Sequence, residues 1–317
     1  MNIVIIDGYT LNPGDLSWKN LKKLGQVSIY PRTSATEFIS RAQDAAILIV
    51  NKHIIDAATF EKLPHLKCIC VSATGVNNID LQAAKKHGVT VCNVIDYSTP
   101  SVAQHVFALL LELTNKIALH NNSVHQGGWS KQEDFCYTLS SIHELSDLSL
   151  GIYGFGRIGQ RVATIALAFG MTVFAHHKHP KRDAMDGVTF VDLPTLFTKS
   201  NIISLHAPLN TTNQQLVNQA LLQLMPQPSF LVNTGRGGLI NEEDLLYCLQ
   251  NNILNAAALD VLSVEPPPKN HPLLTQKNCI ITPHIAWASK ASRQRLLDET
   301  VWNISAFIKG EPGNVVS

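Results

Sequence analysis

Short apolar runs alternate with helical patterns along the whole chain. Eleven of these runs are predicted strands: Asn2–Ile6, Ala46–Val50, Cys68–Val71, Thr90–Asn93, Leu150–Tyr153, Thr172–Ala175, Thr189–Val191, Ile202–Leu205, Phe230–Asn233, Ala256–Asp260 and Cys279–Thr282. Strands that are apolar nearly throughout, and that are separated by helices, indicate parallel sheets covered on both faces. The pattern therefore predicts an α/β protein of the doubly wound class.

The number of strands predicts two domains, because eleven strands are more than one open sheet usually holds. The break falls at residues 98–101, Ser-Thr-Pro-Ser. Residues 102–126 then have the pattern of one long helix, which Ser98 or Thr99 can cap and whose first turn suits Pro100. Its apolar residues lie on nearly all sides, which indicates burial on more than one face. A subunit interface and the interior of the same chain explain this equally well.

Composition limits the classes of function. Of the 317 residues, 45% are hydrophobic and 15% are charged, which is enough apolar material for two cores. The chain has 25 Lys and Arg residues and 24 Asp and Glu residues. A nearly neutral chain lacks the positive surface that nucleic acids and anionic membranes require, so we expect neither partner. The N-terminus lacks the features of a signal peptide, no apolar run is long enough to span a membrane, and the six cysteines form no CxxC pair. We therefore expect a cytoplasmic protein with reduced, buried thiols.

A glycine motif carries the first chemical signal. Gly154-x-Gly156-x-x-Gly159 follows a predicted strand and opens a helix, and a second strand comes after that helix. This context is the one a dinucleotide-binding motif needs, because the first glycine makes the tight turn, the second lets the pyrophosphate approach and the third lets helix and strand pack closely. The first helical turn, with Arg157 and Ile158, would face the phosphates.

The segment after the second strand leaves the choice of cofactor open. Sites for NAD usually place an acidic residue there, about 20 residues after the motif, to bind the ribose hydroxyls. This chain has His176, His177 and Lys178, followed by further basic residues. The basic segment suits the 2′-phosphate of NADP(H), but an exposed loop beside bound NAD(H) is an equal alternative. We expect no metal site, because we find no carboxylate or thiolate to complete a ligand set with the histidines.

Three later residues suggest the reaction. Arg236 lies between glycines directly after a strand, Glu265 precedes three prolines, and His284 follows a strand and a proline. A keto-acid reductase needs a cation for the substrate carboxylate, a proton donor, and a carboxylate that stabilises the donor's charged form. Arg236, His284 and Glu265 match these three requirements in that order, since a guanidinium fork fits a carboxylate.

The chain resembles the D-isomer-specific 2-hydroxyacid dehydrogenases over essentially its whole length. The matching motifs are GFGRIGQRVA, HAPLNTTNQQLVN, LVNTGRGGLINEEDL, ALDVLSVEPP and NCIITPHIAWAS. Within the family, the opening IVIIDGYTLNPGDLSW, the segment PSVAQHVFALLLELTN and the later KNHPLL are similar to the bacterial glycerate dehydrogenases, also called hydroxypyruvate reductases. The missing acidic residue after the second strand is the one departure from the family pattern.

The resemblance implies a domain arrangement and a reaction. The fold would consist of two Rossmann-like doubly wound parallel-sheet domains with the active site in the cleft. Residues 1–99 and 287–317 would bind substrate, residues 100–286 would bind the nucleotide, and a helix from Ser289 to about Lys309 would return to the first domain. The enzyme would form a homodimer through the helix after Pro100, and NAD(H) or NADP(H) would reduce a small 2-keto acid, such as hydroxypyruvate or glyoxylate, to the D-2-hydroxy acid.

The resemblance also implies three sets of site residues. The catalytic residues would be Arg236, Glu265 and His284, with His284 as proton donor. The substrate-binding residues would be Asn51, Lys52, Thr74, Gly75, Val76 and Arg236. The cofactor-binding residues would be Val102, Gly154, Gly156, Arg157, Ile158, Gly159, His176, His177, Lys178, Ala207, Pro208, Thr234, Asp260 and His284, with Asp260 at the nicotinamide carboxamide.

Two other functions are compatible with the same motifs. A phosphoglycerate dehydrogenase shares the family pattern, and a nucleotide-sensing corepressor could use the same fold without catalysis. A formate dehydrogenase is disfavoured, because Glu265 stands where a neutral amide would be expected.

Overall fold

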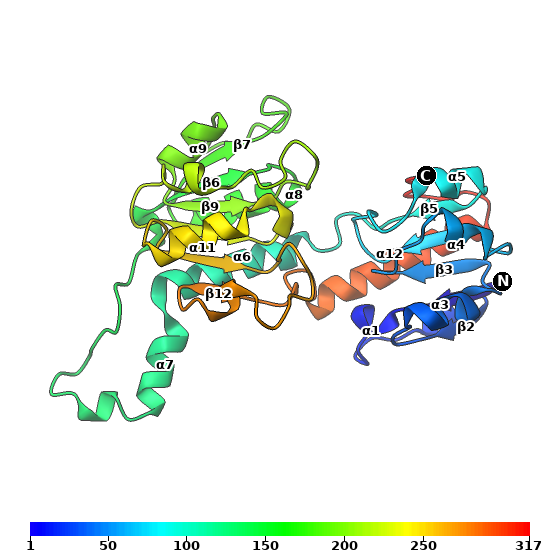
Figure 1. Ribbon diagram of the computed structural model, residues 1–317, viewed down its shortest axis with the longest axis horizontal. Coiled ribbons are helices and arrows are strands. Elements are labelled where there is room, and N and C mark those ends of the chain that lie inside the picture. Colours follow the sequence, from blue (N-terminus) through cyan, green and yellow to red (C-terminus); the bar gives the residue numbers. More distant parts are fainter. The chain divides into compact units, whose positions relative to one another are not determined.

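The computed structural model describes residues 1–317, which divide into two compact units. Unit 1 comprises Met1–Ser98 and Ala288–Ser317, and unit 2 comprises Thr99–Trp287. The boundaries predicted from sequence lie one residue from these. Each unit contains one parallel sheet with helices against it, of five strands in unit 1 and seven in unit 2 (Figure 1). The predicted fold class, two doubly wound parallel sheets, is confirmed.

The sheet of unit 1 has the strand order β2-β1-β3-β4-β5. Its strands are β1 (Asn2–Ile5), β2 (Gln26–Ile29), β3 (Ile47–Val50), β4 (Cys68–Val71) and β5 (Thr90–Cys92). Its helices are α1 (Gly8–Leu11), α2 (Lys19–Lys22), α3 (Ala35–Ala42), α4 (Ala57–Glu61), α5 (Leu81–Lys86) and α12 (Lys290–Ile308). The order reverses between β1 and β3, and in open α/β sheets ligands bind at the carboxyl ends of the strands beside such a reversal.

Strand β2 was missed by the sequence analysis. Its residues Gln-Val-Ser-Ile alternate between exposed and half-buried positions, because β2 is the edge strand and pairs only with β1. The other eleven strands lie within one residue of their predicted bounds. The helix α12, capped by Ser289, also matches its prediction, and its Ile304 lies in a core cluster with Ile3 and Ile5 of β1. Both ends of the chain therefore build unit 1.

The sheet of unit 2 has the order β12-β11-β10-β9-β6-β7-β8, with its reversal between β6 and β9. Its strands are β6 (Ser149–Tyr153), β7 (Thr172–His176), β8 (Val188–Phe190), β9 (Ile202–Leu205), β10 (Phe230–Asn233), β11 (Ala256–Leu259) and β12 (Cys279–Ile281). Its α-helices are α6 (Thr99–Asn115), α7 (Ile117–His125), α8 (Arg157–Ala168), α9 (Leu193–Lys199), α10 (Gln219–Leu222) and α11 (Glu242–Gln250). Four short 3-10 turns complete it: η1 (Trp129–Lys131), η2 (Leu145–Asp147), η3 (Gly237–Leu239) and η4 (Pro272–Thr275).

The prediction of one long helix over residues 102–126 is wrong. Lys116 has the left-handed backbone angle φ 52°, and α6 and α7 meet there at a 59° bend. The carboxylate of Glu112 accepts hydrogen bonds from the N–H of Ala118 in the first turn of α7, so a side chain of one helix caps the next. No single helix is long and apolar enough to cross a membrane, and α6 and α7 reach that length and composition only together, across the bend.

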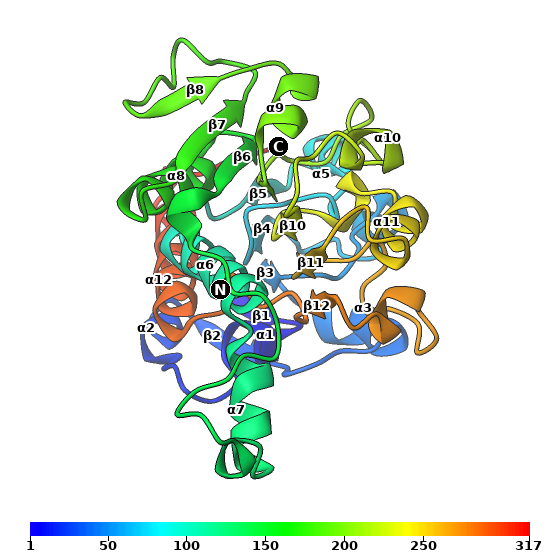
Figure 2. The ribbon, with the colours of Figure 1, turned by 90° about the vertical axis from the view of Figure 1, so that its left-hand side faces the viewer.

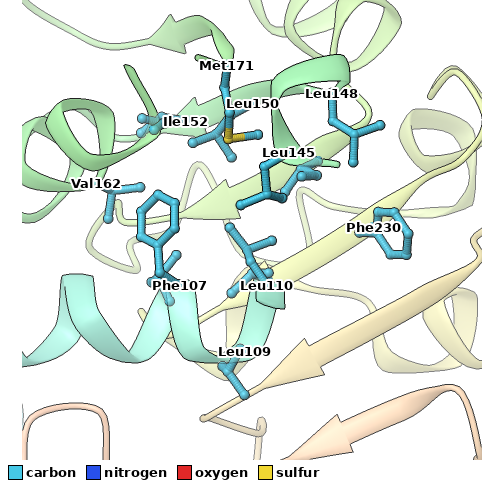
Figure 3. Packing of buried hydrophobic residues seen from close by; sticks show 14 of the residues in the cluster. Phe107, Leu109, Leu110, Leu145, Leu148, Leu150, Ile152, Val162, Met171 and Phe230 are labelled. Atoms are coloured by element: carbon cyan, nitrogen blue, oxygen red, sulfur yellow. The ribbon is translucent and has the colours of Figure 1, made fainter. Parts of the chain in front are cut away.

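The two halves of the predicted helix differ in their burial. Leu109, Leu110 and Leu113 of α6 are all buried within the core of unit 2. Figure 3 shows Phe107 and Leu110 pointing from α6 toward Leu145 and other residues of this core. The interior of the same chain, rather than a subunit interface, thus explains the apolar faces of α6. By contrast, α7 has no buried residue, and it projects with the following loop away from the rest of its unit (Figures 1 and 2).

All six cysteines are free thiols, but not all are buried. Cys68, Cys70, Cys92 and Cys248 lie in the cores, and Cys279 is half-buried. Cys136, in the loop after α7, is exposed, so the expectation of buried thiols is wrong for this residue.

Candidate active site

The loop between β6 and α8 contains three glycines, and two of them are required by the packing of the chain while the third is not. Gly154 has φ +93°, and a Cβ there would lie 2.5 Å from the backbone nitrogen of Ala207. A Cβ on Gly159 would lie 2.4 Å from the carbonyl oxygen of Gly154. Gly156 differs, because its φ is −77° and a Cβ there would meet nothing within 4 Å. The fold of the chain therefore explains Gly154 and Gly159, whereas Gly156 leaves space for a ligand against the backbone.

The surroundings of this loop fit a dinucleotide. Gly156 is the N-cap residue of α8 and has no side chain that could bind the first N–H groups of the helix. These N–H groups, from Arg157 and Ile158 onward, therefore face the loop, where an anion can bind them. Ala207 and Pro208 follow β9, which lies next to β6 across the reversal of strand order. Thr234 follows β10, and its Oγ1 is buried without a hydrogen-bond partner in the chain, as expected for a group that binds a ligand. Val102 is buried in the first turns of α6.

The end of β7 contains an acidic partner that the sequence analysis missed. His177 Nδ1 accepts a hydrogen bond from the N–H of Phe155, at 3.2 Å, and His177 Nε2 lies 2.7 Å from Asp183 Oδ2. An acceptor at Nδ1 and a donor at Nε2 together describe a neutral imidazole. Asp183 also pairs with Arg182, whose hydrogen bonds and charge lower the pKa of Asp183 to about 2. The expectation that no carboxylate accompanies these histidines is therefore wrong, because Asp183 contacts His177.

The other two residues of this segment that the sequence assigned to the cofactor are His176 and Lys178. The Nδ1 of His176 lies 3.0 Å from the carbonyl oxygen of Val191, and its ring stacks on Tyr153 at the end of β6. Lys178 is exposed. No group of three or more His, Cys, Asp or Glu side chains in the structure is arranged to hold a metal ion.

His284 and Glu265 form a close pair. His284 follows β12 with φ 54°, and its Nδ1 lies 2.6 Å from Glu265 Oε2. Both side chains are partly exposed, at 26% and 34%. The other oxygen of Glu265 accepts a hydrogen bond from the N–H of Leu262. Because Glu265 occupies Nδ1, the Nε2 of His284 is the nitrogen that can exchange a proton with a substrate.

The carboxylate of Asp260 holds the loop that carries His284. Asp260 is 1% exposed. Its Oδ1 accepts hydrogen bonds from the hydroxyl of Thr282 at 2.6 Å and the N–H of Ile285 at 2.9 Å, and its Oδ2 from the N–H of Ala286 at 2.8 Å. Its backbone carbonyl also accepts from the N–H of His284. The resemblance assigned Asp260 to the nicotinamide, and in the structure its carboxylate already binds three groups of its own chain.

Arg236 lies on the loop after β10 with an exposed side chain, and its Nη1 donates to the carbonyl oxygen of Gly235. The next residue, Gly237, is required by packing, because a Cβ there would lie 2.0 Å from the carbonyl carbon of Leu262. This close approach brings the loop of Arg236 against the loop that leads to Glu265.

The predicted substrate residues of unit 1 follow β3 and β4. The carboxylate of Asp7, at the end of β1, accepts hydrogen bonds from the backbone N–H groups of Asn51 and Lys52. The side chain of Asn51 in turn donates to the carbonyl oxygen of Ser72, at 2.7 Å, which joins the loops after the two strands. Asp7 was missed, although an acidic residue at a strand end beside the reversal of strand order was a usable signal.

The loop after β4 is also fixed by side chains. Thr74 donates from its hydroxyl to the carbonyl oxygen of Val94, and Asn93 donates to the carbonyl oxygen of Thr74. Gly75 follows half-buried, and Val76 packs against the core of unit 1. The predicted site residues thus lie in two groups, one at the strand ends of each unit.

Comparisons with known proteins identify relatives of the whole chain. Residues 107–286 match the model of the D-isomer specific 2-hydroxyacid dehydrogenase, NAD binding domain. A hydroxypyruvate reductase of Blautia hydrogenotrophica is 44% identical over the full length of both chains, and a glycerate dehydrogenase of Methylorubrum extorquens is 40% identical over 88% of each. Among solved structures, an acyclic imino acid reductase in complex with NADPH and D-Arg is 32% identical and covers all of both chains, with a TM-score of 0.87.

Proposed function

The chain belongs to the family of D-isomer-specific 2-hydroxyacid dehydrogenases, with NAD(H) or NADP(H) as cofactor and a small 2-keto acid as substrate, and on that premise we propose that it reduces hydroxypyruvate and glyoxylate. The two curated relatives described above support this substrate class. The 2.6 Å pair of His284 and Glu265 carries the proposal within the structure, because a proton donor with a carboxylate behind it is what reduction of a keto group requires.

Each residue of the site has a defined task. The nicotinamide cofactor, when bound, supplies the hydride. His284 donates a proton from Nε2 to the substrate oxygen, and Glu265 stabilises the imidazolium at Nδ1 before that transfer. Arg236 binds the substrate carboxylate through its guanidinium fork.

Steady-state kinetics test the substrate. We expect kcat/KM for hydroxypyruvate and glyoxylate to exceed that for 3-phosphohydroxypyruvate by at least ~10-fold, a discrimination of at least ~1.4 kcal/mol. Chiral chromatography should identify the product from hydroxypyruvate as D-glycerate. Preference for the phosphorylated acid would instead establish a phosphoglycerate dehydrogenase. Tight NADH binding without turnover of any of the three would favour a nucleotide sensor.

The same proposal covers the choice of cofactor. His177 stands where NAD sites usually place an acidic residue, and its neutral ring does not repel a 2′-phosphate. Arg182, with a side chain 67% exposed, can turn from Asp183 to such a phosphate. We expect NADPH to be used within ~10-fold of the efficiency of NADH, less than ~1.4 kcal/mol of discrimination.

A variant pair tests this part of the proposal. Arg182→Ala should lower kcat/KM for NADPH and leave the value for NADH unchanged, whereas Lys277→Ala, at another exposed position of unit 2, should change neither. A strong preference for NADH in the parent, unaffected by Arg182→Ala, would show that the basic segment does not face the cofactor.

A homodimer through α7 and the following loop is the proposed assembly. This arm, residues 117–142, exposes large apolar side chains: Ile117, Leu119, Val124, Trp129, Phe135, Leu139 and Ile142. Monomers rarely leave so many together in water, and a second copy with the same arm would cover them. A cytoplasmic location, where both nicotinamide cofactors are available, completes the proposal.

Light scattering tests the assembly. Phe135, at 88% exposure, makes Phe135→Asp a surface change, so this variant should be a folded monomer while the parent is a dimer. Leu110→Glu should unfold instead, because Leu110 is fully buried within its own chain. A monomeric parent protein would contradict the proposed assembly.

A further inference from the structure

His105 of α6 lies against the loop that carries His284, in unit 2, although nothing in its sequence surroundings points there. Its Nε2 lies 3.0 Å from the Oγ1 of Thr282 and 3.5 Å from the Oδ1 of Asp260. The His105 side chain is 19% exposed, so the contact is largely shielded from water. His105 and Thr282 are 177 residues apart in the chain, and they meet because α6 packs against β10 and β11 of the same sheet.

The direction of these hydrogen bonds follows from the number of protons. The hydroxyl of Thr282 has one proton, and the 2.6 Å distance assigns it to the carboxylate of Asp260. The Thr282 oxygen must then accept, so His105 donates from its Nε2–H. The result is one chain of hydrogen bonds, in which His105 donates to Thr282 and Thr282 donates to the carboxylate of Asp260. A chain of this kind is strongest when every member keeps its partner.

The end of this chain determines where His284 lies. Asp260 holds the backbone N–H groups of Ile285 and Ala286 with its two oxygens, and it holds His284 through its carbonyl. His284 has the left-handed angle φ 54°, which is uncommon for a residue with a side chain and is costly unless the surrounding structure stabilises it. The bonds to Asp260 supply that stabilisation on both sides of His284.

We propose that His105 is a positioning residue for the reaction: by donating to Thr282 it orients the carboxylate of Asp260 and so keeps His284 in its productive position. This inference rests on the proposed role of His284 as proton donor. His105 acts through Thr282 and Asp260 and transfers no proton to the substrate. Displacing a reacting group by about 1 Å can cost up to about 100-fold in rate, so a residue remote from the chemistry can have this effect.

Two substitutions at position 105 separate the donor from the volume of the side chain. His105→Leu fills a similar space without a donor, and His105→Gln places an amide N–H near the position of Nε2. We expect kcat to fall about 10- to 100-fold in His105→Leu and to return within ~3-fold of the parent in His105→Gln. The dissociation constant for NADH, measured by fluorescence, should change less than ~2-fold in both. Gln104→Ala, at an exposed position of the same helix, is the matched control and should equal the parent.

Hydrogen exchange gives a readout that does not depend on activity. In the protein without cofactor, the backbone amides of Ile285 and Ala286 should exchange at least ~10-fold faster in His105→Leu than in Gln104→Ala. Thr282→Val should have the same effect on exchange and on kcat, and the double variant His105→Leu/Thr282→Val should lose little more than either single one. If His105→Leu does not fold, His105→Gln and Thr282→Val still decide, because the chain of hydrogen bonds predicts near-normal kcat for the first and a large loss for the second.

The outcomes distinguish this inference from the proposed function. Parent-like kcat and exchange in His105→Leu would overturn the positioning role, as would additive losses in the double variant. A His284→Ala variant with normal kcat would refute the proposed function instead, whatever the exchange of Ile285 and Ala286 showed.

Discussion

The three glycines of the loop after β6 should respond differently to the same change, Gly→Ala. Gly154→Ala forces a side chain into φ +93° and brings its Cβ within 2.5 Å of the backbone of Ala207. The left-handed angle costs about 1–2 kcal/mol and overpacking about 1–3 kcal/mol, so we expect the free energy of unfolding to fall by about 2–5 kcal/mol. Gly159→Ala meets the carbonyl oxygen of Gly154 at 2.4 Å and should cost about 1–3 kcal/mol.

Gly156→Ala is the informative member of the series. The added Cβ meets no atom of the chain and φ is −77°, so stability should change by less than about 1 kcal/mol, the usual difference between Gly and Ala at a helix N-cap. The same Cβ occupies the space where the cofactor pyrophosphate is expected. The dissociation constant for NADH should therefore rise at least ~10-fold, a loss of at least ~1.4 kcal/mol of binding.

Urea denaturation and titration of NADH fluorescence measure the two effects separately. The reasoning requires that Gly156→Ala be nearly as stable as the parent and bind poorly, while Gly154→Ala is clearly destabilised. Parent-like binding of NADH by Gly156→Ala would refute it, because the open space would then not be the cofactor site. A loss of stability in Gly156→Ala as large as in Gly154→Ala would also refute it.

Three further results are expected. His284→Ala should lower kcat at least ~100-fold while NADH still binds, as for loss of a general acid, and near-normal turnover would remove His284 from the mechanism. Arg236→Lys keeps the charge but not the guanidinium fork, so kcat/KM should fall at least ~10-fold, and a parent-like value would exclude a bidentate contact. Burial lowers the pKa of His206 to about 4 from an ordinary 6.5, so between these values only the unfolded chain binds the proton and stability decreases as the pH falls. His206→Asn should reduce that slope by at most about 1.4 kcal/mol per pH unit in urea denaturation between pH 7 and 4.5, and an unchanged slope would assign the acid sensitivity to other groups.

The sequence alone determined the class of fold and the backbone of the glycine loop after β6. Central strands such as Ile47–Val50 and Ile202–Leu205 are buried on both faces, and residues buried on both faces must be apolar without interruption, which is a local pattern. Gly154 and Gly159 are likewise required by the backbone around them. The sequence did not predict the edge strand β2. This strand pairs with only one neighbour, so its sequence is half polar and carries no such pattern.

Only the tertiary structure decided which side chains meet. The sequence predicted Glu265 as the carboxylate partner of His284, and the structure gives their distance of 2.6 Å, but the sequence gave no sign that His105 would reach Thr282. The sequence of α6 was equally compatible with burial in its own chain and with burial against a second copy. In the structure, its leucines lie in the core of unit 2. These contacts join segments that are far apart in the chain, and local periodicity describes only a residue's own helix or strand. The packing of the sheets against their helices therefore determines which distant residue packs against a helix face or accepts a hydrogen bond.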